Sequence, residues 1–246
     1  RKGKRNMSWR SDKPATLSYV IALDEGDQAN KVAFRDELFQ WEAPFTSEAT
    51  SITKIQQRFS GIIWGNETLA IVYDDWYDTR NTKTYLINPS NPSQAPKIIF
   101  DRNSQDIYAD PGNFETKKNQ FNREVLAIEN GNIYLIGDGN TKDGQFPFID
   151  EFNLETLKTK RLYTSKMKDK KEDLLGIEDF KKGEVLVMIQ SKNDYPNYYF
   201  RNIKSKDKLT QITFFANPFE SIKDVYKEVI RYKRKDGVDL TGTLYL

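Results

Sequence analysis

A strand–turn–strand pattern recurs four times along the chain, and this repeat constrains the fold more than any other feature of the sequence. Each copy has two hydrophobic, alternating segments around a short polar turn, which is typical of an antiparallel hairpin. The copies cover residues 7–23, 61–73, 125–137 and 174–189. Aligned on their second strands, Thr16, Leu69, Ile133 and Val185 lie 53, 64 and 52 residues apart. The chain is therefore predicted to repeat one structural unit, with insertions of variable length.

A second pair of strand-like segments follows three of these hairpins, in residues 82–100, 146–164 and 197–213. Each unit thus holds about four short antiparallel strands, and four strands per repeat of about 50 residues are typical of β-propeller blades. We expect an all-β fold with about four blades. Residues 47–59 are the best helix candidate, but they alternate as well as they follow a helical period, and they are predicted to be strand.

Charge and hydropathy argue against two classes of partner. Lys plus Arg is 38 and Asp plus Glu is 36, and the formal net charge of +2 gives no strong field to attract nucleic acid or an anionic membrane. The longest unbroken apolar runs, 69–73 and 185–189, have five residues each. A membrane helix needs roughly 20. Neither nucleic acid nor a membrane is a predicted partner.

The sequence contains no Cys and no His. The lack of Cys excludes disulfides and thiolate metal sites. His is the side chain whose ordinary pKa lies near neutrality, so its lack excludes a Ser-His-Asp or Cys-His arrangement and a His-ligated zinc site within these residues. No catalytic residue, metal site or cofactor is predicted for this segment.

Two local motifs have weak functional interpretations. Ser-x-x-Lys occurs at Ser51, Ser165 and Ser205, but such matches are expected by chance in a chain this rich in Ser and Lys. The Gly-rich segment 137–144 suggests a calcium loop, yet Asp143 stands where an EF-hand loop requires Gly. A solvated blade loop is the prediction there.

Residues 74–89 are the stretch densest in chemistry. Asp74, Asp75, Trp76, Tyr77, Asp78 and Arg80 crowd a predicted connection between the second and third strands of one blade. Such connections reach a face of the propeller, where binding residues are often found. One interpretation is an aromatic plug with ion pairs. The other is that Arg80, with Trp76 and Tyr77, is presented to a substrate, and Arg80 is the residue to test.

Six segments, in family order and spread over essentially the whole chain, carry a resemblance to a known family. They are SWRSDKPATLSYVIALDEGD, RDELFQWEAPF, WYDTRNTKTYLINP, DPGNF, YLIGDGNTKDGQFPFIDEFNLETLKTKRLYTS and YKRKDGVDLTGTLYL. Together they resemble the propeller portion of a prolyl oligopeptidase family serine peptidase. The nearest branch is that of the glutamyl endopeptidases of plant chloroplasts and bacteria.

In that family, a propeller of seven or eight blades precedes a C-terminal α/β-hydrolase domain that carries Ser, Asp and His. The resemblance implies that residues 1–218 form an incomplete set of blades. Residues 219–246 would then be a linker and the first strand of a hydrolase domain missing from this sequence, so both ends of the chain look cut. Four blades of such a ring would form an open arc with unpaired edges.

The resemblance implies a substrate-gating role in a serine peptidase that acts on peptides. The missing hydrolase domain, a partner in the same polypeptide, would supply the catalytic groups, and the segment alone should be inactive. Cleavage after acidic residues, if the glutamyl branch is right, needs a cation, and Arg pairs with a carboxylate bidentately. Arg80 is the first candidate for this cation, and Arg123 is a weaker one.

The alternative function is a stand-alone propeller that binds protein or carbohydrate without catalysis. Resemblance to exported bacterial members implies a periplasmic or secreted location. The exact peptide specificity, the total blade number, the oligomeric state, the origin of the cut ends and the residues that face the central cavity stay open at this point.

Overall fold

Four antiparallel sheets of four strands each make up most of the computed structural model, which describes residues 3–205, 208–222 and 225–246. The first sheet contains β1 (Arg5–Trp9), β2 (Thr16–Ala22), β3 (Asp36–Glu42) and β4 (Thr50–Ile55). The second contains β5 (Arg58–Asn66), β6 (Leu69–Trp76), β7 (Asn81–Ile87) and β8 (Lys97–Asn103). The third contains β9 (Asn113–Phe114), β12 (Asn132–Gly137), β15 (Phe148–Asn153) and β16 (Thr159–Thr164). The fourth contains β17 (Lys171–Asp179), β18 (Glu184–Gln190), β19 (Asn197–Asn202) and β20 (Lys208–Gln211).

Shorter elements are added to this framework. The third unit also has two small ribbons, β10 (Thr116–Lys118) with β11 (Glu124–Leu126) and β13 (Asn140–Thr141) with β14 (Gly144–Gln145). A terminal hairpin of β21 (Lys227–Lys233) and β22 (Asp239–Tyr245) follows the fourth sheet. The described helices are the 3₁₀ turns η1 (Ile107–Ala109) and η2 (Glu220–Ile222). Within the described ranges, no helix has the length and apolar character needed to cross a bilayer.

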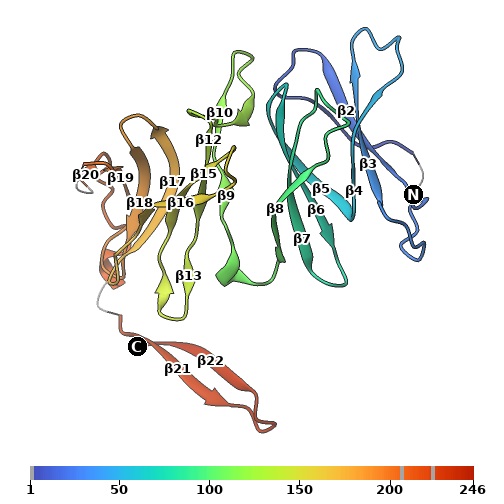
Figure 1. Ribbon diagram of the computed structural model, residues 1–246. Coiled ribbons are helices and arrows are strands. Elements are labelled where there is room, and N and C mark those ends of the chain that lie inside the picture. Colours follow the sequence, from blue (N-terminus) through green and yellow to red (C-terminus); the bar gives the residue numbers. More distant parts are fainter. Residues whose placement is uncertain (1–2, 206–207, 223–224) are drawn as a thin grey trace.

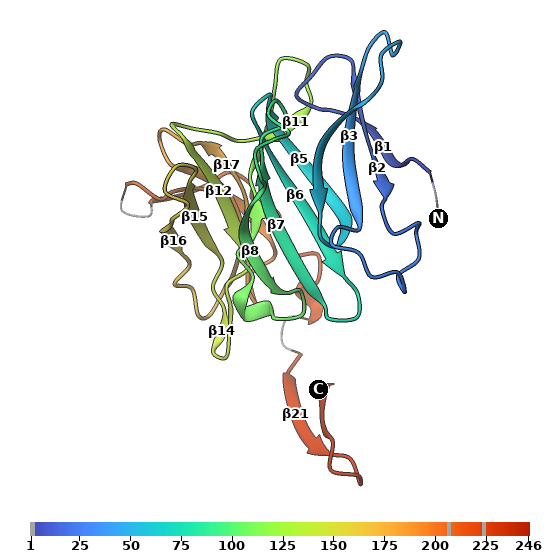
Figure 2. The same ribbon diagram turned by 45° about the vertical axis from the view of Figure 1, so that its right-hand side comes forward.

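The sheets stand side by side in chain order, like the blades of a fan (Figures 1 and 2). Among the described residues, no strand pairing and no core cluster joins the first sheet to the fourth. The predicted all-β fold of four blades in an open arc is therefore confirmed. The segment 47–59, predicted to be strand, forms β4 and the start of β5.

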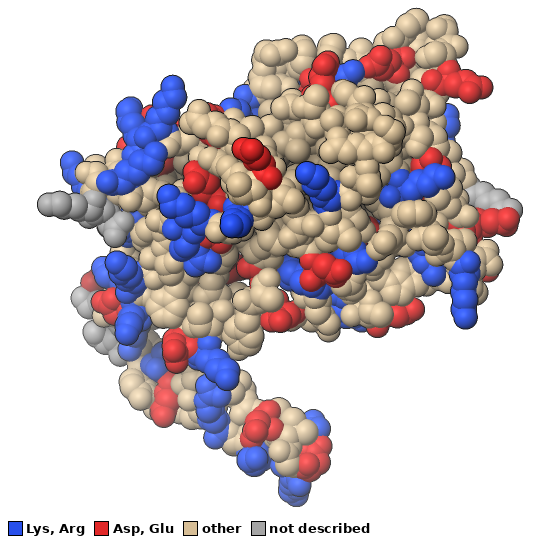
Figure 3. Space-filling view, in the orientation of Figure 1, with Lys and Arg blue, Asp and Glu red and all other residues tan. Residues whose placement is uncertain are grey.

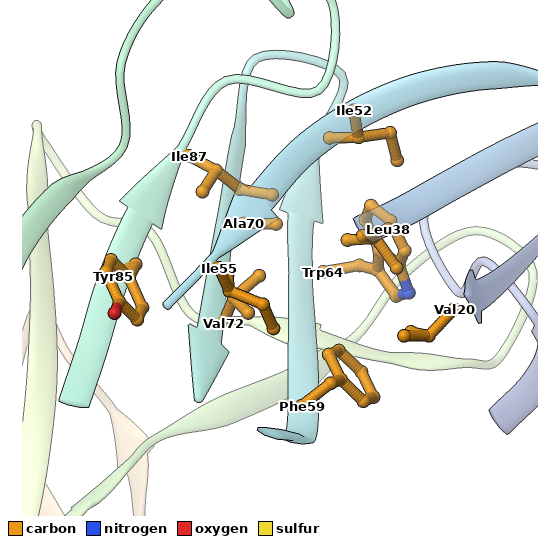
Figure 4. Close-up of a cluster of buried hydrophobic side chains, with 10 residues drawn as sticks. All are labelled: Val20, Leu38, Ile52, Ile55, Phe59, Trp64, Ala70, Val72, Tyr85 and Ile87. Atoms are coloured by element: carbon orange, nitrogen blue, oxygen red, sulfur yellow. The ribbon is translucent and has the colours of Figure 1, made fainter. Parts of the chain in front are cut away.

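Three apolar clusters fill the three seams between neighbouring blades. The second strand of a blade shows how one element serves two seams. Ala70, Ile71 and Val72 are consecutive and fully buried in β6. Because side chains alternate across a strand, Ala70 and Val72 join the first seam (Figure 4), whereas Ile71 joins the second.

Because the strands are antiparallel, the connections between them lie on two opposite faces of the arc. In every blade the second and fourth strands run the same way, so the chain leaves both at one face, to which the C-terminal hairpin is attached. We call this the hairpin face; it carries residues 23–35, 77–80, 138–147 and 191–196. The opposite, or far, face carries residues 10–15 and 119–123. In Figure 1 the hairpin face is at the bottom of the molecule and the far face is at the top.

One predicted hairpin is wrong. Residues 125–137 were expected to pair as two strands, but β11 pairs with β10, and β12 pairs with β9 and β15. The tight turn itself forms, because Asn132 N donates to Glu129 O at 3.0 Å. Beyond the turn, Glu115 N donates to Tyr134 O and Ala127 N donates to Glu115 O, each at 2.9 Å. Residues 113–118 thus insert between the two strands, a non-local event that local alternation does not reveal.

Candidate functional site

The turn 77–80 joins β6 to β7 on the hairpin face, as the sequence predicted for the connection between second and third strands. Arg80 occupies the left-handed region with a φ of 56°. Its backbone is held on both sides: Arg80 N donates to Tyr77 O at 3.4 Å, and Ser104 N donates to Arg80 O at 2.7 Å. The turn is therefore fixed to the neighbouring edge of the same blade.

Two arginine–aromatic stacks involve residues in this turn or next to it. The Arg80 guanidinium carbon lies 3.8 Å from the centroid of the Tyr77 ring, and Tyr77 is 71% exposed. The Arg35 guanidinium carbon lies 4.0 Å from the centroid of Trp76, and Arg35 also forms an ion pair with Asp24 at 2.8 Å. Within the described part of the chain, no carboxylate lies within 4.0 Å of the Arg80 guanidinium. Trp76 therefore contacts an arginine that is already neutralised, whereas Arg80 is stacked and available.

A buried polar network lies inside the blade, next to this turn. Asp74 is fully buried, and its carboxylate accepts from Tyr85 Oη at 2.8 Å and from Gln57 N at 3.0 Å. Burial raises the pKa of Asp74 because it disfavours the charged form more than these hydrogen bonds favour it. Burial, and then the Asp74 carboxylate, raise the pKa of Tyr85. Gln57 extends the network to the Asn81 side chain at the start of β7.

Arg123 lies on the far face, away from Trp76, Tyr77 and Arg80. Its guanidinium donates to three backbone carbonyls of the β1–β2 connection: Arg10 O at 3.1 Å, Lys13 O at 2.8 Å and Pro14 O at 3.3 Å. Trp76, which ends β6, and Tyr77 and Arg80, in the turn that follows, all lie on the hairpin face. The two candidate arginines sit at opposite ends of the blades.

A groove of about 1360 Å³ lies on the hairpin face at the base of the C-terminal hairpin. Its walls come from the third and fourth blades, from the segment around η2 and from the hairpin. The charged side chains that line it are Lys168, Lys170, Lys171, Lys192 and Lys227, with Asp143, Asp169 and Asp194. Among the described residues, these five lysines and three aspartates give the lining a formal charge of +2.

One ion pair in this groove is well formed. Lys170 Nζ lies 2.9 Å from Asp194 Oδ2, and Ser191 Oγ donates to the same oxygen at 2.7 Å. The Ser191 hydroxyl and then Lys170 lower the pKa of Asp194. Figure 3 shows Lys and Arg side chains over the left-hand part of the molecule, where the fourth blade lies, and on the hairpin. The sequence signal that could have revealed the groove is the run of lysines between residues 158 and 171.

The described residues contain no group of three or more His, Cys, Asp or Glu side chains placed to hold a metal ion. The Gly-rich segment 137–144, considered above as a calcium loop, forms the small β13–β14 ribbon on the hairpin face. Gly139 has a φ of +63° there, and a Cβ at this position would lie 1.8 Å from Phe146 O. Its glycines therefore meet the demands of a close backbone turn.

Two named plant proteins are similar in sequence to this chain. The chain is 39% identical, over its whole length, to a protein of Oryza sativa subsp. japonica named probable glutamyl endopeptidase, chloroplastic. It is 37% identical, again over its whole length, to the protein of the same name from Arabidopsis thaliana. The chain is homologous to a segment of each of these two proteins. The family resemblance carried by the six sequence segments is confirmed.

The chain spans 28% and 27% of the length of these two relatives. No family model matches the sequence. Among solved structures, the β-propeller domain of the trilobed protease from Pyrococcus furiosus aligns with a TM-score of 0.45 and 11% identity, covering 97% of this chain and 63% of that one. The assignment of four blades rests on the strand pairing of the chain itself.

Proposed function

We propose that this chain is the access-controlling propeller segment of a serine peptidase of the glutamyl endopeptidase type. The observation that carries the proposal is the 39% identity, over the whole chain, to a probable glutamyl endopeptidase. A propeller placed over a catalytic domain limits which substrates reach the reacting groups. Those groups would come from the partner domain, because these 246 residues contain no His to act as the base.

The C-terminal segment supports a partner domain on the hairpin face. Within the described residues, β21 and β22 pair only with each other, and their side chains are largely exposed. Val229, Tyr232 and Leu244 are 57%, 52% and 38% exposed. Exposed apolar side chains grouped on one element are typical of surfaces that another domain covers. We therefore propose that the blades end near residue 218 and that residues 219–246 lead into an α/β-hydrolase domain.

A preference for acidic residues is the finer part of the proposal. A substrate carboxylate needs a cation with no carboxylate of its own, presented on the face where the partner domain would dock. Arg80 meets both conditions, and the Tyr77 ring beneath it restricts its motion. The Lys-lined groove adds positive charge on the same face. Arg123 is left out of this role because it lies on the far face and binds three carbonyl oxygens.

The first prediction is that Arg80→Gln weakens the acidic preference of the complete protein. A hydrogen-bonded contact to a charged group contributes about 2 kcal/mol, so kcat/KM for peptides with Glu before the scissile bond should fall about 30-fold. Peptides with Gln at that position should change little. Arg102→Gln is the matched control, because Arg102 lies in the same blade but is already paired with Asp110 at 3.0 Å. Equal losses in the two variants would contradict the assignment of Arg80.

The broader test compares the complete protein with the 246-residue segment on a peptide series. The complete protein should cleave after Glu, and the segment alone should cleave nothing. Hydrolysis after uncharged residues at the same rate would overturn the acidic preference. Peptide or carbohydrate binding without any cleavage by the complete protein would overturn the peptidase proposal and favour a stand-alone binding module.

We also propose that the parent protein is exported, to the periplasm or beyond. The support is the resemblance to exported bacterial peptidases; the two plant relatives are named chloroplastic, which concerns those proteins. Fractionation of the source cells, followed by detection with an antibody against the segment, tests this location. Recovery in the cytoplasmic fraction alone would overturn it.

A further inference from the structure

The ribbon β10–β11 of the third blade reaches the first blade, over 100 residues earlier in the chain. Asn119 Nδ2 donates to Ser11 O at 2.8 Å, and the Arg123 guanidinium donates to the carbonyl oxygens of Arg10, Lys13 and Pro14. Both partners lie on the far face. These contacts skip the second blade, which lies between the two in chain order.

This contact shows which edge strand of the second blade faces the axis of the propeller. In a fan of sheets, blades that are not neighbours approach each other only where the sheets converge, at the axis. The ribbon must therefore cross the axial edge of the second blade, which is β5. In agreement, a Cβ at Gly65 in β5 would lie 3.5 Å from Leu126 Cβ and 3.1 Å from Ile128 Cδ1. Val125, Leu126 and Ala127 are buried at this crossing.

The receiving side of the contact is rigid. Arg10 is 1% exposed, its guanidinium carbon lies 4.1 Å from the centroid of Trp64 in β5, and it forms an ion pair with Asp12 at 2.6 Å. Its side chain also donates to Gln40 Oε1 in β3. Side-chain contacts to the first and second blades thus hold Arg10, whose carbonyl accepts from Arg123, in place.

The tip of the β10–β11 ribbon, which donates these hydrogen bonds, is itself ordered by internal hydrogen bonds. Asn119 Oδ1 accepts from Phe121 N at 2.9 Å and from Arg123 N at 3.2 Å, which closes the tip of the ribbon into a compact turn. Asn122 occupies the left-handed region with a φ of 57°. Asn119 therefore orders the tip and contacts Ser11 with the same side chain, and Arg123 follows at the position that reaches residues 10–14.

We propose that residues 116–126 are a strap that narrows the axial opening of the propeller on its far face, and that Asn119 and Arg123 are the latch that holds it. The strap admits short peptides and hinders the entry of long unfolded chains. Arg123 acts here as a positioning residue and contacts no substrate. This inference rests on the proposed peptidase function, whose access route it specifies.

The experiment uses the complete protein with Arg123→Ala and, as a milder variant, Arg123→Lys, which keeps the charge but loses the guanidinium fork. Lys118→Ala is the matched control, because Lys118 is an exposed residue of the same ribbon. Two quantities are measured: hydrogen exchange of the amides of residues 116–126, and the ratio of kcat/KM for a long unfolded polypeptide to that for a short peptide.

Loss of the Arg123 contacts should speed exchange of the strap about tenfold and raise the ratio severalfold, with the short-peptide rate unchanged. Unchanged exchange would overturn the latch. Faster exchange with an unchanged ratio would overturn the filter while the peptidase function stands. A wild-type protein that cleaves neither substrate would overturn the proposed function and the filter together, and the exchange data would still report on the latch.

Discussion

At the scale of single residues, buried carboxylates in this chain are held by tyrosine hydroxyls and arginines from neighbouring strands. Tyr85 donates to Asp74 at 2.8 Å, and Tyr163 donates to Glu172 at 2.7 Å. Burial and then the carboxylate raise the pKa of each tyrosine, so both hydroxyls keep their protons and act as donors over the ordinary pH range. A buried carboxylate without such a donor would cost several kcal/mol or take up a proton.

The second prediction concerns Tyr85→Phe, which removes one donor to Asp74. We expect the free energy of unfolding to fall by about 2 kcal/mol near neutral pH. The hydroxyl stabilises the ionised carboxylate, so the loss should shrink as pH falls through the raised pKa of Asp74. Denaturant unfolding at several pH values measures this. Tyr19→Phe is the control, because buried Tyr19 stacks on Phe39. Equal losses in both variants, at every pH, would contradict the prediction.

At the scale of elements, hairpins formed wherever two alternating segments had no competing strand. The exception is the third blade, where residues 113–118 take the backbone partners that residues 125–127 were expected to supply. Gly112 permits this insertion, because its φ is +87° and a Cβ there would lie 2.4 Å from Ile136 O. Any side chain at residue 112 would collide with the backbone of β12.

The third prediction compares Gly112→Ala with Gly131→Ala. Both glycines have a positive φ, of +87° and +76°, so both variants bear the strain of a left-handed alanine, about 1 kcal/mol. Nothing lies within 4 Å of a Cβ at Gly131. The clash at Gly112 should add about 2 kcal/mol or more, and it should speed hydrogen exchange at residues 113–118. Equal stability of the two variants, measured by denaturant unfolding, would contradict the role given to Gly112.

At the scale of the whole molecule, the arc is a series of three seams, each filled by its own apolar cluster. Ion pairs also hold the first seam together. Arg58 pairs with both Asp24 and Asp36, and Arg35 pairs with Asp24 at 2.8 Å. In a repeat architecture each unit depends mainly on its neighbours, so damage at one seam should stay local. The hydrogen bonds of the strap pass beyond neighbouring blades, from the third blade to the first.

The fourth prediction is that Asp24→Asn loosens the first seam selectively. Asp24 is buried, and removing one partner of a buried ion pair costs about 3 kcal/mol. Burial opposes ionisation of Asp24, but hydrogen bonds from Arg58 and Arg35 outweigh it and lower its pKa. The wild-type stabilisation is therefore present above the ordinary pKa of an aspartate and is lost as pH falls through the lowered value. Hydrogen exchange should rise in β2 to β5, and exchange in β17 to β19 should not change. A uniform rise across all blades would contradict seam-by-seam stability.

The sequence by itself determined the features that depend on residues close together in the chain. Alternation and turn residues set the four-strand repeat, and the aromatic and charged turn at residues 77–80 was placed correctly at a blade end because strand order follows from the hairpins. Composition fixed the lack of an imidazole base. The family resemblance could be detected in six segments because it depends on the order of residues along the chain, which the sequence shows directly.

Only the tertiary structure decided which distant groups meet. Arg80 and Arg123 are both candidate cations in the sequence, yet the strands that flank them put them on opposite faces. The backbone carbonyls of Arg10, Lys13 and Pro14 also engage the Arg123 guanidinium. The insertion of residues 113–118, the Lys-lined groove and the strap all join segments far apart in the chain. Such contacts depend on how strands and blades pack against one another in three dimensions, which no local pattern encodes.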